Sequence, residues 1–365
     1  MSKVTIRMLS TATIVKGQGV GSAYLEQVGL VKTNTEDFTI LTKHQRGDAD
    51  IYHIHTINPT FYLRMRKKRA NVVYVHFVPS TLDGSIRLPR WLFRLYKWYI
   101  TKFYKKADEL VVVNPCFKKD LISIGIKEDS ITYIPNYVSL DNFFPLKNEE
   151  KVRIRKDFGL SNEKFIVLGV GQIQNRKGVE SFVEVAKLNP DIEFVWAGGF
   201  SFGVLSDGYD KLKKLYNNPP ANVHFIGIVD REKMNEVINI GDALFLPSYN
   251  ELFPMSILEA SNVGKPIILR DLNLYRDILY DWYEKGNTEQ EFSTVIQKLK
   301  NNESFYKKAV ENSTRIKEYY SEENVSNLWK DYYLRIYDKY SNRRKKKWKK
   351  YWLQLKQLSI YLRRC

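Results

Sequence analysis

The sequence contains very little cysteine: Cys116 and Cys365 are the only two among 365 residues. Two cysteines cannot form the framework of several disulfides that stabilises small secreted domains. The N-terminal segment MSKVTIRMLS has the pattern of a strand and lacks the apolar centre of a secretory signal peptide. We therefore expect a protein of the reducing cytosol.

Long apolar runs are also missing. No window approaches the roughly 18 uninterrupted apolar residues that a membrane-spanning helix needs. A content of 44% hydrophobic and 27% charged residues is that of a soluble globular protein, and the length is sufficient for two domains with full cores. We expect no segment that spans a bilayer.

Acidic residues are absent from two segments that are rich in basic ones. Residues 87–106 carry seven basic and no acidic side chains, and residues 343–364 carry ten basic and no acidic ones. Together they account for the whole formal charge of +17, so the rest of the chain is about neutral. Two separate basic segments indicate an anionic surface as a partner.

Aromatic residues alternate with the cations in both segments, as in helices that lie among lipid headgroups. In the first segment Trp91, Leu95, Trp98 and Tyr99 share one helical stripe. An alternative is that this stripe packs on the domain core, and nucleic acid is a rival partner for the charge. The Trp and Leu content favours anionic membrane lipids, so we expect no nucleic acid. The expected membrane-binding residues are Arg90, Trp91, Arg94 and Trp98 in the first segment, and Lys345, Lys346, Lys347, Trp348 and Trp352 in the second.

A strand–loop–helix–strand unit stands out in the second half of the chain. Ala243–Leu246 has the pattern of a buried strand, Pro254 suits the first turn of a helix, and residues 267–269 form a second buried run. Glu251 follows the first strand, where ligands bind in open α/β sheets. Glu259 lies about a turn and a half into the helix.

These two carboxylates and the helix start between them fit a nucleotide-sugar. Carboxylates accept hydrogen bonds from sugar and ribose hydroxyls, and the amides of Phe253, Met255 and Ser256 suit a diphosphate. A surface loop followed by an ordinary amphipathic helix has the same spacing, so the residues alone leave both interpretations open.

Two further loops follow predicted strands. Val4–Leu9 leads into KGQGVGS, in which Gly19 and Gly21 allow the backbone to approach a ligand, although a plain tight turn is an equal alternative. The first strand of the second half leads into GVGQIQNRKG, in which Arg176 and Lys177 can neutralise a diphosphate leaving group.

Three histidines lie on or at the end of two predicted strands of the first half. His53 and His55 share one face of a strand by the period of two, and His76 ends the next strand. For His53 and His55, no Cys or third His stands at ligand spacing, so we expect these two to be buried or to line a cleft and not to hold a metal.

Both halves alternate helices with buried strands, the pattern of a parallel doubly wound sheet. A polar, proline-bounded segment at about 140–150 is typical of an interdomain hinge. We expect a first domain over residues 1–145, a second over 146–322, a helix over 323–340 and a basic amphipathic tail over 341–365.

The segment ELFPMSILEA, from Glu251 to Ala260, resembles the E-x7-E signature of retaining GT-B glycosyltransferases. Lys177 and the glycine after it match the basic-glycine pair of that family, whereas Gln172 stands where an arginine is frequent. Asn136 matches the family's linker, and Tyr137 departs from its glycine. Within the family, the chain is most similar to the short bacterial diglycosyldiacylglycerol synthases.

The resemblance implies an α/β protein of GT-B fold, with two Rossmann-like domains that face a cleft and a last helix that crosses back onto the first domain. It implies transfer of a hexose, glucose or galactose, from a UDP-hexose to a glycolipid acceptor with retention. We expect monoglucosyldiacylglycerol as the acceptor, at the cytoplasmic face of the membrane. No cofactor and no metal are expected, since cations and helix amides would stabilise the diphosphate.

The resemblance also assigns roles to residues. His76, Glu251 and Lys177 would be catalytic, with Glu251 at the hydroxyls of the sugar and Glu259 at the ribose. The expected donor-binding set is Gly19, Gly21, Arg176, Lys177, Glu251, Phe253, Met255, Ser256 and Glu259. Two alternatives remain: a transferase for a polyprenyl-linked glycan of capsule or exopolysaccharide synthesis, and a non-catalytic binding protein on the same fold.

Overall fold

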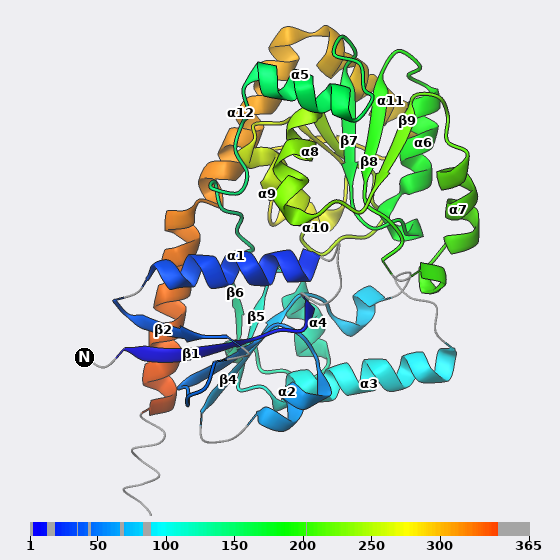
Figure 1. The fold of residues 1–365 in the computed structure, drawn as a ribbon. Helices are drawn as coiled ribbons and strands as arrows, with labels where there is room; N and C mark the ends of the chain where they lie inside the picture. Colours follow the sequence, from blue (N-terminus) through cyan, green and yellow to red (C-terminus); the bar gives the residue numbers. More distant parts are fainter. Residues whose placement is uncertain are drawn as a thin grey trace, which may run out of the picture.

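The computed structural model describes residues 3–12, 19–34, 36–42, 45–65, 69–82, 89–201 and 203–341. These residues form two six-stranded sheets in which all strands are parallel, each flanked by helices (Figure 1). The predicted fold class is confirmed for this part of the chain. The predicted membrane-binding residues Lys345, Lys346, Lys347, Trp348 and Trp352 lie outside the described residues.

The first sheet is built from the N-terminal part of the chain. Its strands stand in the order β2 (Phe38–Leu41), β1 (Val4–Leu9), β3 (Ile51–Ile54), β4 (Ala70–Val75), β5 (Glu109–Val112) and β6 (Ile131–Tyr133). The connecting helices are α1 (Gly19–Thr33), α2 (Pro59–Arg64), α3 (Arg90–Lys106) and α4 (Phe117–Ser123). Every residue of β4 and β5 is buried, which explains the apolar runs at residues 72–75 and 110–112 within them.

The second sheet has the order β12 (Glu284–Gly286), β11 (Ile267–Arg270), β10 (Ala243–Leu246), β7 (Ile166–Val170), β8 (Glu193–Ala197) and β9 (Val223–Gly227). Its helices are α5 (Asn148–Asp157), α6 (Val179–Lys187), α7 (Tyr209–Asn217), α8 (Met234–Ile240), α9 (Met255–Asn262), α10 (Asn273–Arg276), α11 (Glu289–Asn301) and α12 (Glu303–Tyr319). The strand order reverses between β7 and β10. In open α/β sheets, ligands bind in the crevice at such a reversal, outside the carboxyl ends of the strands.

A long helix over residues 322–341 follows α12 and packs on the first sheet (Figure 1). Trp329 and Tyr333 are fully buried there, and the Trp329 ring lies edge-on to Tyr74 of β4. Lys339 pairs with the buried carboxylate of Glu109 at the start of β5. The helix therefore fastens the end of the second domain to the first.

His53, His55 and His76 are all buried, on or after β3 and β4. For His53 and His55 this confirms the prediction of buried or cleft-lining side chains. The Tyr333 hydroxyl lies 2.6 Å from Nδ1 of His53, and Nδ1 of His55 lies 3.4 Å from Nε2 of His76. Burial lowers the pKa of His53 and of His76 to about 3, and it lowers the pKa of His55 well below the ordinary value. All three rings are therefore neutral at pH 7.

These buried histidines predict that acid destabilises the protein below pH 6.5. A histidine in the unfolded chain titrates near 6.5, so between about pH 6.5 and 3 the unfolded chain binds more protons than the folded one. The free energy of unfolding then falls as the pH falls, by up to about 1.4 kcal/mol per pH unit for each histidine. Denaturant unfolding at several pH values measures this slope.

His55→Leu tests the origin of the slope, because Nε2 of His55 has no hydrogen-bond partner within the described part of the chain. We expect this variant to lose stability less steeply between pH 6.5 and 4 than the natural protein. Equal slopes for the two proteins would contradict the assignment to the buried histidines.

Candidate active site

The predicted site residues of the second domain come together at the reversal of its strand order. β7 and β10 are direct neighbours, with Ala243 opposite Val167 and Leu244 opposite Leu168. The loop after β7 contains Arg176 and Lys177, and the loop after β10 contains Glu251. Both loops leave the carboxyl edge of the sheet at the same point, which is why residues far apart in sequence can meet.

Gly178 allows the two loops to touch. Its φ is +67°, in the left-handed region, and a Cβ at this position would lie 2.3 Å from the carbonyl oxygen of Pro247. Any side chain would therefore collide with the backbone that leads out of β10. This close approach brings the preceding residue, Lys177, next to Glu251.

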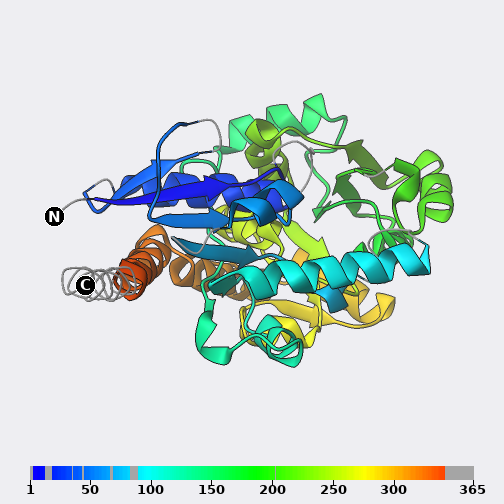
Figure 2. The ribbon, with the colours of Figure 1, turned by 90° about the horizontal axis from the view of Figure 1, so that it is seen from below.

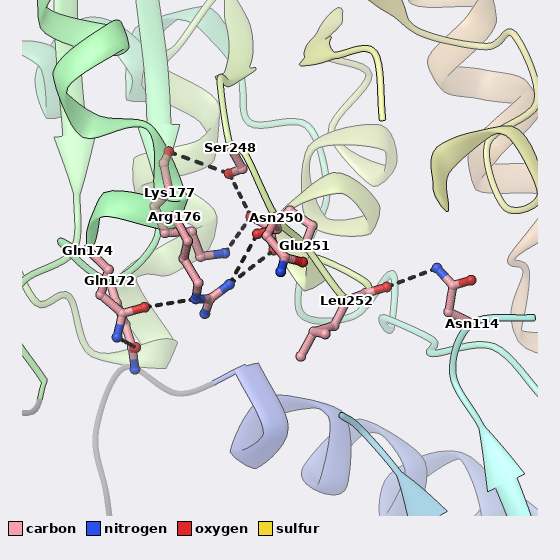
Figure 3. Close-up of polar contacts among 9 residues, drawn as sticks. All are labelled: Asn114, Gln172, Gln174, Arg176, Lys177, Ser248, Asn250, Glu251 and Leu252. Atoms are coloured by element: carbon pink, nitrogen blue, oxygen red, sulfur yellow. Dashed lines mark hydrogen bonds and ion pairs between the residues drawn. The ribbon is translucent and has the colours of Figure 1, made fainter. Parts of the chain in front are cut away.

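Lys177 and Glu251 form a buried ion pair (Figure 3). Nζ of Lys177 lies 2.6 Å from Oε1 of Glu251, and the Ser248 hydroxyl donates to the same oxygen at 2.7 Å. The side chains are only 13% and 3% exposed. Buried charges of this kind are tolerated only when each is paired and hydrogen-bonded, and here each supplies the partner for the other.

The environment keeps the Glu251 carboxylate ionised. Burial alone would raise the pKa of Glu251, but the charges of Lys177 and Arg176 and the hydrogen bonds from Lys177 and Ser248 outweigh it and lower the pKa. Burial also lowers the pKa of Lys177, and the charge of Glu251 offsets this only in part. An ionised carboxylate can accept hydrogen bonds from sugar hydroxyls, and the ammonium can donate to a phosphate oxygen.

Arg176 is the second cation at this edge of the sheet. Its Nη1 lies 3.9 Å from Oε2 of Glu251, and its Nε donates to Oε1 of Gln174 at 3.0 Å. Gln174 in turn donates to Oε1 of Gln172 at 2.9 Å (Figure 3). Gln172, which replaces the arginine frequent in the resembling family, therefore belongs to the hydrogen-bonded chain that orients Arg176.

Helix α9 begins directly after this loop and carries the second carboxylate. Pro254 is its N-cap residue and makes no side-chain capping bond, so the first amides of the helix are not occupied by a cap. Met255 and Ser256 form its first turn and Phe253 precedes the cap, and all three are buried.

Glu259 is 4% exposed and accepts a hydrogen bond of 2.9 Å from Nη1 of Arg231. Burial raises the pKa of Glu259, against the effect of Arg231. Nη2 of Arg231 lies 2.5 Å from Oε1 of Glu26 in α1. The sequence does not predict that Glu259 contacts Arg231 or that Arg231 contacts Glu26. Arg231 stands in a polar segment, where a charged residue does not indicate a site.

A second unpredicted contact reaches the loop from the first domain. Asn114, which follows β5 and is fully buried, donates from Nδ2 to the carbonyl oxygen of Leu252 at 3.0 Å (Figure 3). Leu252 is the residue after Glu251, so the first domain holds the loop of the candidate site directly.

Gly19 of the first domain lies beside the same helix. Gly19 is the first residue of α1, and a Cβ added to it would lie 4.0 Å from Cγ of Met255. Gly21 is buried in the first turn of α1. Residues 13–18, which precede them in sequence, lie outside the described residues.

His76 follows β4 at the carboxyl edge of the first sheet, within the buried histidine group. Its ring forms a hydrogen bond with His55 of the same domain. Among the described residues, no hydrogen bond joins His76 to Glu251 or Lys177. Its predicted place beside the transferred sugar therefore stays a prediction.

Helix α3 lies at the outside of the molecule (Figure 2), and most of the predicted aromatic stripe on it is exposed. Trp91, Leu95 and Trp98 are 69%, 52% and 57% exposed, and Arg90 and Arg94 are exposed beside them. The buried face of this helix consists of Ile100, Phe103 and Tyr104. The alternative in which the stripe packs on the core is therefore wrong for these three residues, whereas Tyr99 is half-buried and donates to the carbonyl oxygen of Ile57.

None of the helices in the described residues is both long and apolar enough to cross a membrane. The same residues also contain no group of three or more His, Cys, Asp or Glu side chains that could hold a metal ion.

Two family models match the chain, one in each domain. The model described as Glycosyltransferase Family 4 matches residues 33–142, and the model described as Glycosyl transferases group 1 matches residues 150–316. The second match contains Lys177, Glu251 and Glu259.

Curated relatives extend the similarity over almost the whole chain. The chain is 45% identical over 334 residues to the alpha-galactosylglucosyldiacylglycerol synthase of Streptococcus pneumoniae, a match that covers 91% of this chain and 89% of that protein. It is 27% identical over 290 residues to the processive diacylglycerol alpha-glucosyltransferase of Acholeplasma laidlawii, covering 79% of this chain and 85% of that protein.

Solved structures share the fold. Anabaena HepE in complex with UDP-glucose superimposes with a TM-score of 0.70 at 14% identity, covering 89% of this chain and 97% of that chain. The sucrose-phosphate synthase of Thermosynechococcus elongatus superimposes with a TM-score of 0.73 at 15% identity, covering 92% of this chain and 100% of that chain. With its two facing parallel-sheet domains and its similarity to a curated synthase over nearly its whole length, the chain belongs to the GT-B glycosyltransferases of the group 1 and family 4 type.

Proposed function

We propose that this glycosyltransferase moves a galactosyl group from UDP-galactose to monoglucosyldiacylglycerol, with retention at the anomeric carbon, giving a diglycosyldiacylglycerol. The observation that carries the proposal is the buried pair of Lys177 and Glu251 at the reversal of strand order. The name of the relative that is 45% identical supports galactose as the sugar and a glycolipid as the acceptor.

The donor would lie across the edge of the second sheet. Glu251 would accept hydrogen bonds from hydroxyls of the hexose, and Glu259 from the ribose. Lys177, Arg176 and the amides of Phe253, Met255 and Ser256 would hold the diphosphate. Gly19 and Gly21 would let the start of α1 approach the donor from the other domain.

In the reaction, the bond between the anomeric carbon and the phosphate oxygen breaks, and that oxygen keeps the electron pair. The acceptor hydroxyl oxygen bonds to the same face of the anomeric carbon, and its proton passes to the departing diphosphate oxygen. The cations and the helix amides stabilise the charge that develops on the diphosphate, which needs no cofactor and no metal. His76, neutral at pH 7, would donate or accept one hydrogen bond beside the hexose.

The acceptor would reach the site from the cytoplasmic face of the membrane. Trp91, Leu95 and Trp98 would insert among the headgroups, while Arg90 and Arg94 would lie over anionic lipid. Their exposure on α3 supports this arrangement. The tail at residues 342–365 would add further basic contacts.

The proposed reaction is tested with purified protein, UDP-galactose and anionic vesicles that contain monoglucosyldiacylglycerol. We expect a lipid product heavier by one hexose, detected by mass analysis, and an alpha linkage by NMR. Parallel reactions contain UDP-glucose as donor or a polyprenyl-diphosphate-linked sugar as acceptor. A product from UDP-glucose alone would contradict the donor, and a product on the polyprenyl acceptor alone would contradict the lipid.

Replacing either member of the buried pair should abolish most of the activity. We expect Glu251→Gln and Lys177→Met each to lower kcat/KM at least about a hundredfold, the loss typical of a preorganised active-site group. Each single variant also leaves a buried charge without its partner, which costs roughly 3–5 kcal/mol of stability. Transfer assays and thermal unfolding separate the two effects.

The double variant Glu251→Gln with Lys177→Met removes both charges and should recover much of the stability but none of the activity. Lys164→Ala is the matched control, because Lys164 pairs with Glu193 at the opposite, amino edge of the sheet. An active double variant would contradict a role for the pair in transfer.

The exposed stripe of α3 should be required for membrane binding. We expect the double variant Trp91→Ser with Trp98→Ser to bind anionic vesicles at least about tenfold more weakly, equivalent to about 1.4 kcal/mol. Vesicle sedimentation measures the affinity. Leu188→Ser, at an exposed leucine of the second domain, is the control; equal binding by both variants would place the membrane contact elsewhere.

A further inference from the structure

A half-buried arginine, Arg231, links the candidate ribose carboxylate to the other domain. Arg231 donates from Nη1 to Glu259 of α9 at 2.9 Å and from Nη2 to Glu26 of α1 at 2.5 Å. The side chains of Glu26 and Glu259 are 4% and 5% exposed, and that of Arg231 is 23% exposed. One guanidinium thus joins two carboxylates that belong to different domains.

Glu26 also holds the segment that connects the domains. Its Oε2 accepts the backbone amide of Ser139 at 2.9 Å, and its Oε1 accepts Nδ2 of Asn142 at 3.1 Å. The guanidinium of Arg231 lies 5.0 Å from the ring centroid of Phe143 in the same segment. The network therefore contains α1, the connecting segment, the loop after β9 and α9.

We propose that Arg231 is a positioning residue for the donor: it holds Glu259 in the correct orientation for the ribose, and it does so only while Glu26 of the first domain holds Arg231. The proposal rests on the proposed function, since it takes Glu259 as the ribose ligand. It means that donor affinity depends on a contact between the two domains.

The charges explain why the arginine is needed. Glu26 and Glu259 would repel each other without the guanidinium, and Glu259 is already buried enough for its pKa to be raised. A protonated Glu259 would carry no negative charge, and it would therefore accept hydrogen bonds from the two ribose hydroxyls more weakly than the carboxylate does. Arg231 occupies Oε1 of Glu259, and no described residue forms a hydrogen bond to Oε2, which leaves that oxygen for the nucleotide.

The opposite end of the same unit has its own contact with the first domain. Asn114 donates to the carbonyl oxygen of Leu252, next to Glu251. Both carboxylates of the E-x7-E unit are therefore adjacent to a residue held by the first domain. Movement of one domain away from the other would disturb both ends of the donor site.

A purely structural role is a weaker explanation. A buried ion pair is often no more stabilising than an apolar pair of the same volume, because the charges must be removed from water. If Arg231 served only to hold the two domains together, any carboxylate of the second domain could be its partner. The partner is instead Glu259, the carboxylate proposed to bind the ribose.

Glu26→Gln in the full-length protein is the principal test, because Glu26 touches neither sugar nor phosphate in the proposed complex. We expect the Kd for UDP, measured by calorimetry, and the KM for UDP-galactose to rise about tenfold, with kcat changed less than about threefold. Glu193→Gln is the matched control. Glu193 is a buried carboxylate paired with Lys164 and His224 at the far edge of the sheet, and its replacement should leave the affinity for UDP unchanged.

Two further variants separate positioning from folding. Asn142→Ala removes one hydrogen bond to Glu26 and no charge, and it should weaken UDP binding by a smaller factor. Arg231→Lys should bind UDP more tightly than Arg231→Gln, because it keeps the charge. In a Glu259→Gln background, Glu26→Gln should have no further effect on the affinity.

The outcomes are distinct. Unchanged UDP affinity in Glu26→Gln, or effects of Glu26 and Glu259 that add independently, would overturn this inference and leave the proposed function intact. A natural protein that binds no UDP would overturn the proposed function and the inference together.

Discussion

The buried contact between Lys177 and Glu251 is the interaction on which the candidate site depends. A cation and an anion at 2.6 Å, both almost without solvent, are stable only as a pair. Their meeting requires the strand-order reversal that places two loops side by side and a glycine at position 178 that lets them touch. A donor with a diphosphate and sugar hydroxyls offers each member a new partner of the right kind. Binding can therefore exchange one set of charge-assisted bonds for another with little desolvation cost.

Glu259, the second carboxylate of the site, is also buried and paired with a cation, but this cation comes from another segment of the chain. Glu259 is neutralised by Arg231, and Arg231 is held by Glu26 of the first domain. Together with the contact of Asn114 to Leu252, this makes the donor unit a shared element of both domains. The long helix over residues 322–341 fastens the domains on another side, through Trp329 and Tyr333. The site thus forms between two bodies whose mutual position is fixed at several points.

Much of the fold could be predicted from the sequence because parallel strands buried on both faces are mostly apolar, as in β4, β5 and β10. The strands β2 and β12 could not. Both are short edge strands, and β12 consists of Glu, Lys and Gly, so that only its backbone pairing to β11 defines it. The period of two placed His53 and His55 on one face, but their buried setting depends on Tyr333, 280 residues further along the chain.

Site residues that directly follow a strand could be predicted from the sequence. Residues whose partners are far away in the sequence could not. Glu251 and Lys177 stand after strands, so their common edge follows from topology, although their direct bond joins residues 74 apart. Arg231 reaches partners 28 and 205 residues away from a loop that is polar in any case. Local sequence contains no information on such pairs. The pair with Glu259 results from packing within the second domain, and the pair with Glu26 from the packing of one domain on the other.

A crystal structure with bound UDP tests the central claim most directly. The account predicts the diphosphate within hydrogen-bond distance of Lys177 Nζ and of the first amides of α9. It predicts the ribose hydroxyls on Glu259, with Arg231 still bound to that carboxylate. UDP found away from the edge of β7 and β10, or bound there with the ribose far from Glu259, would contradict it.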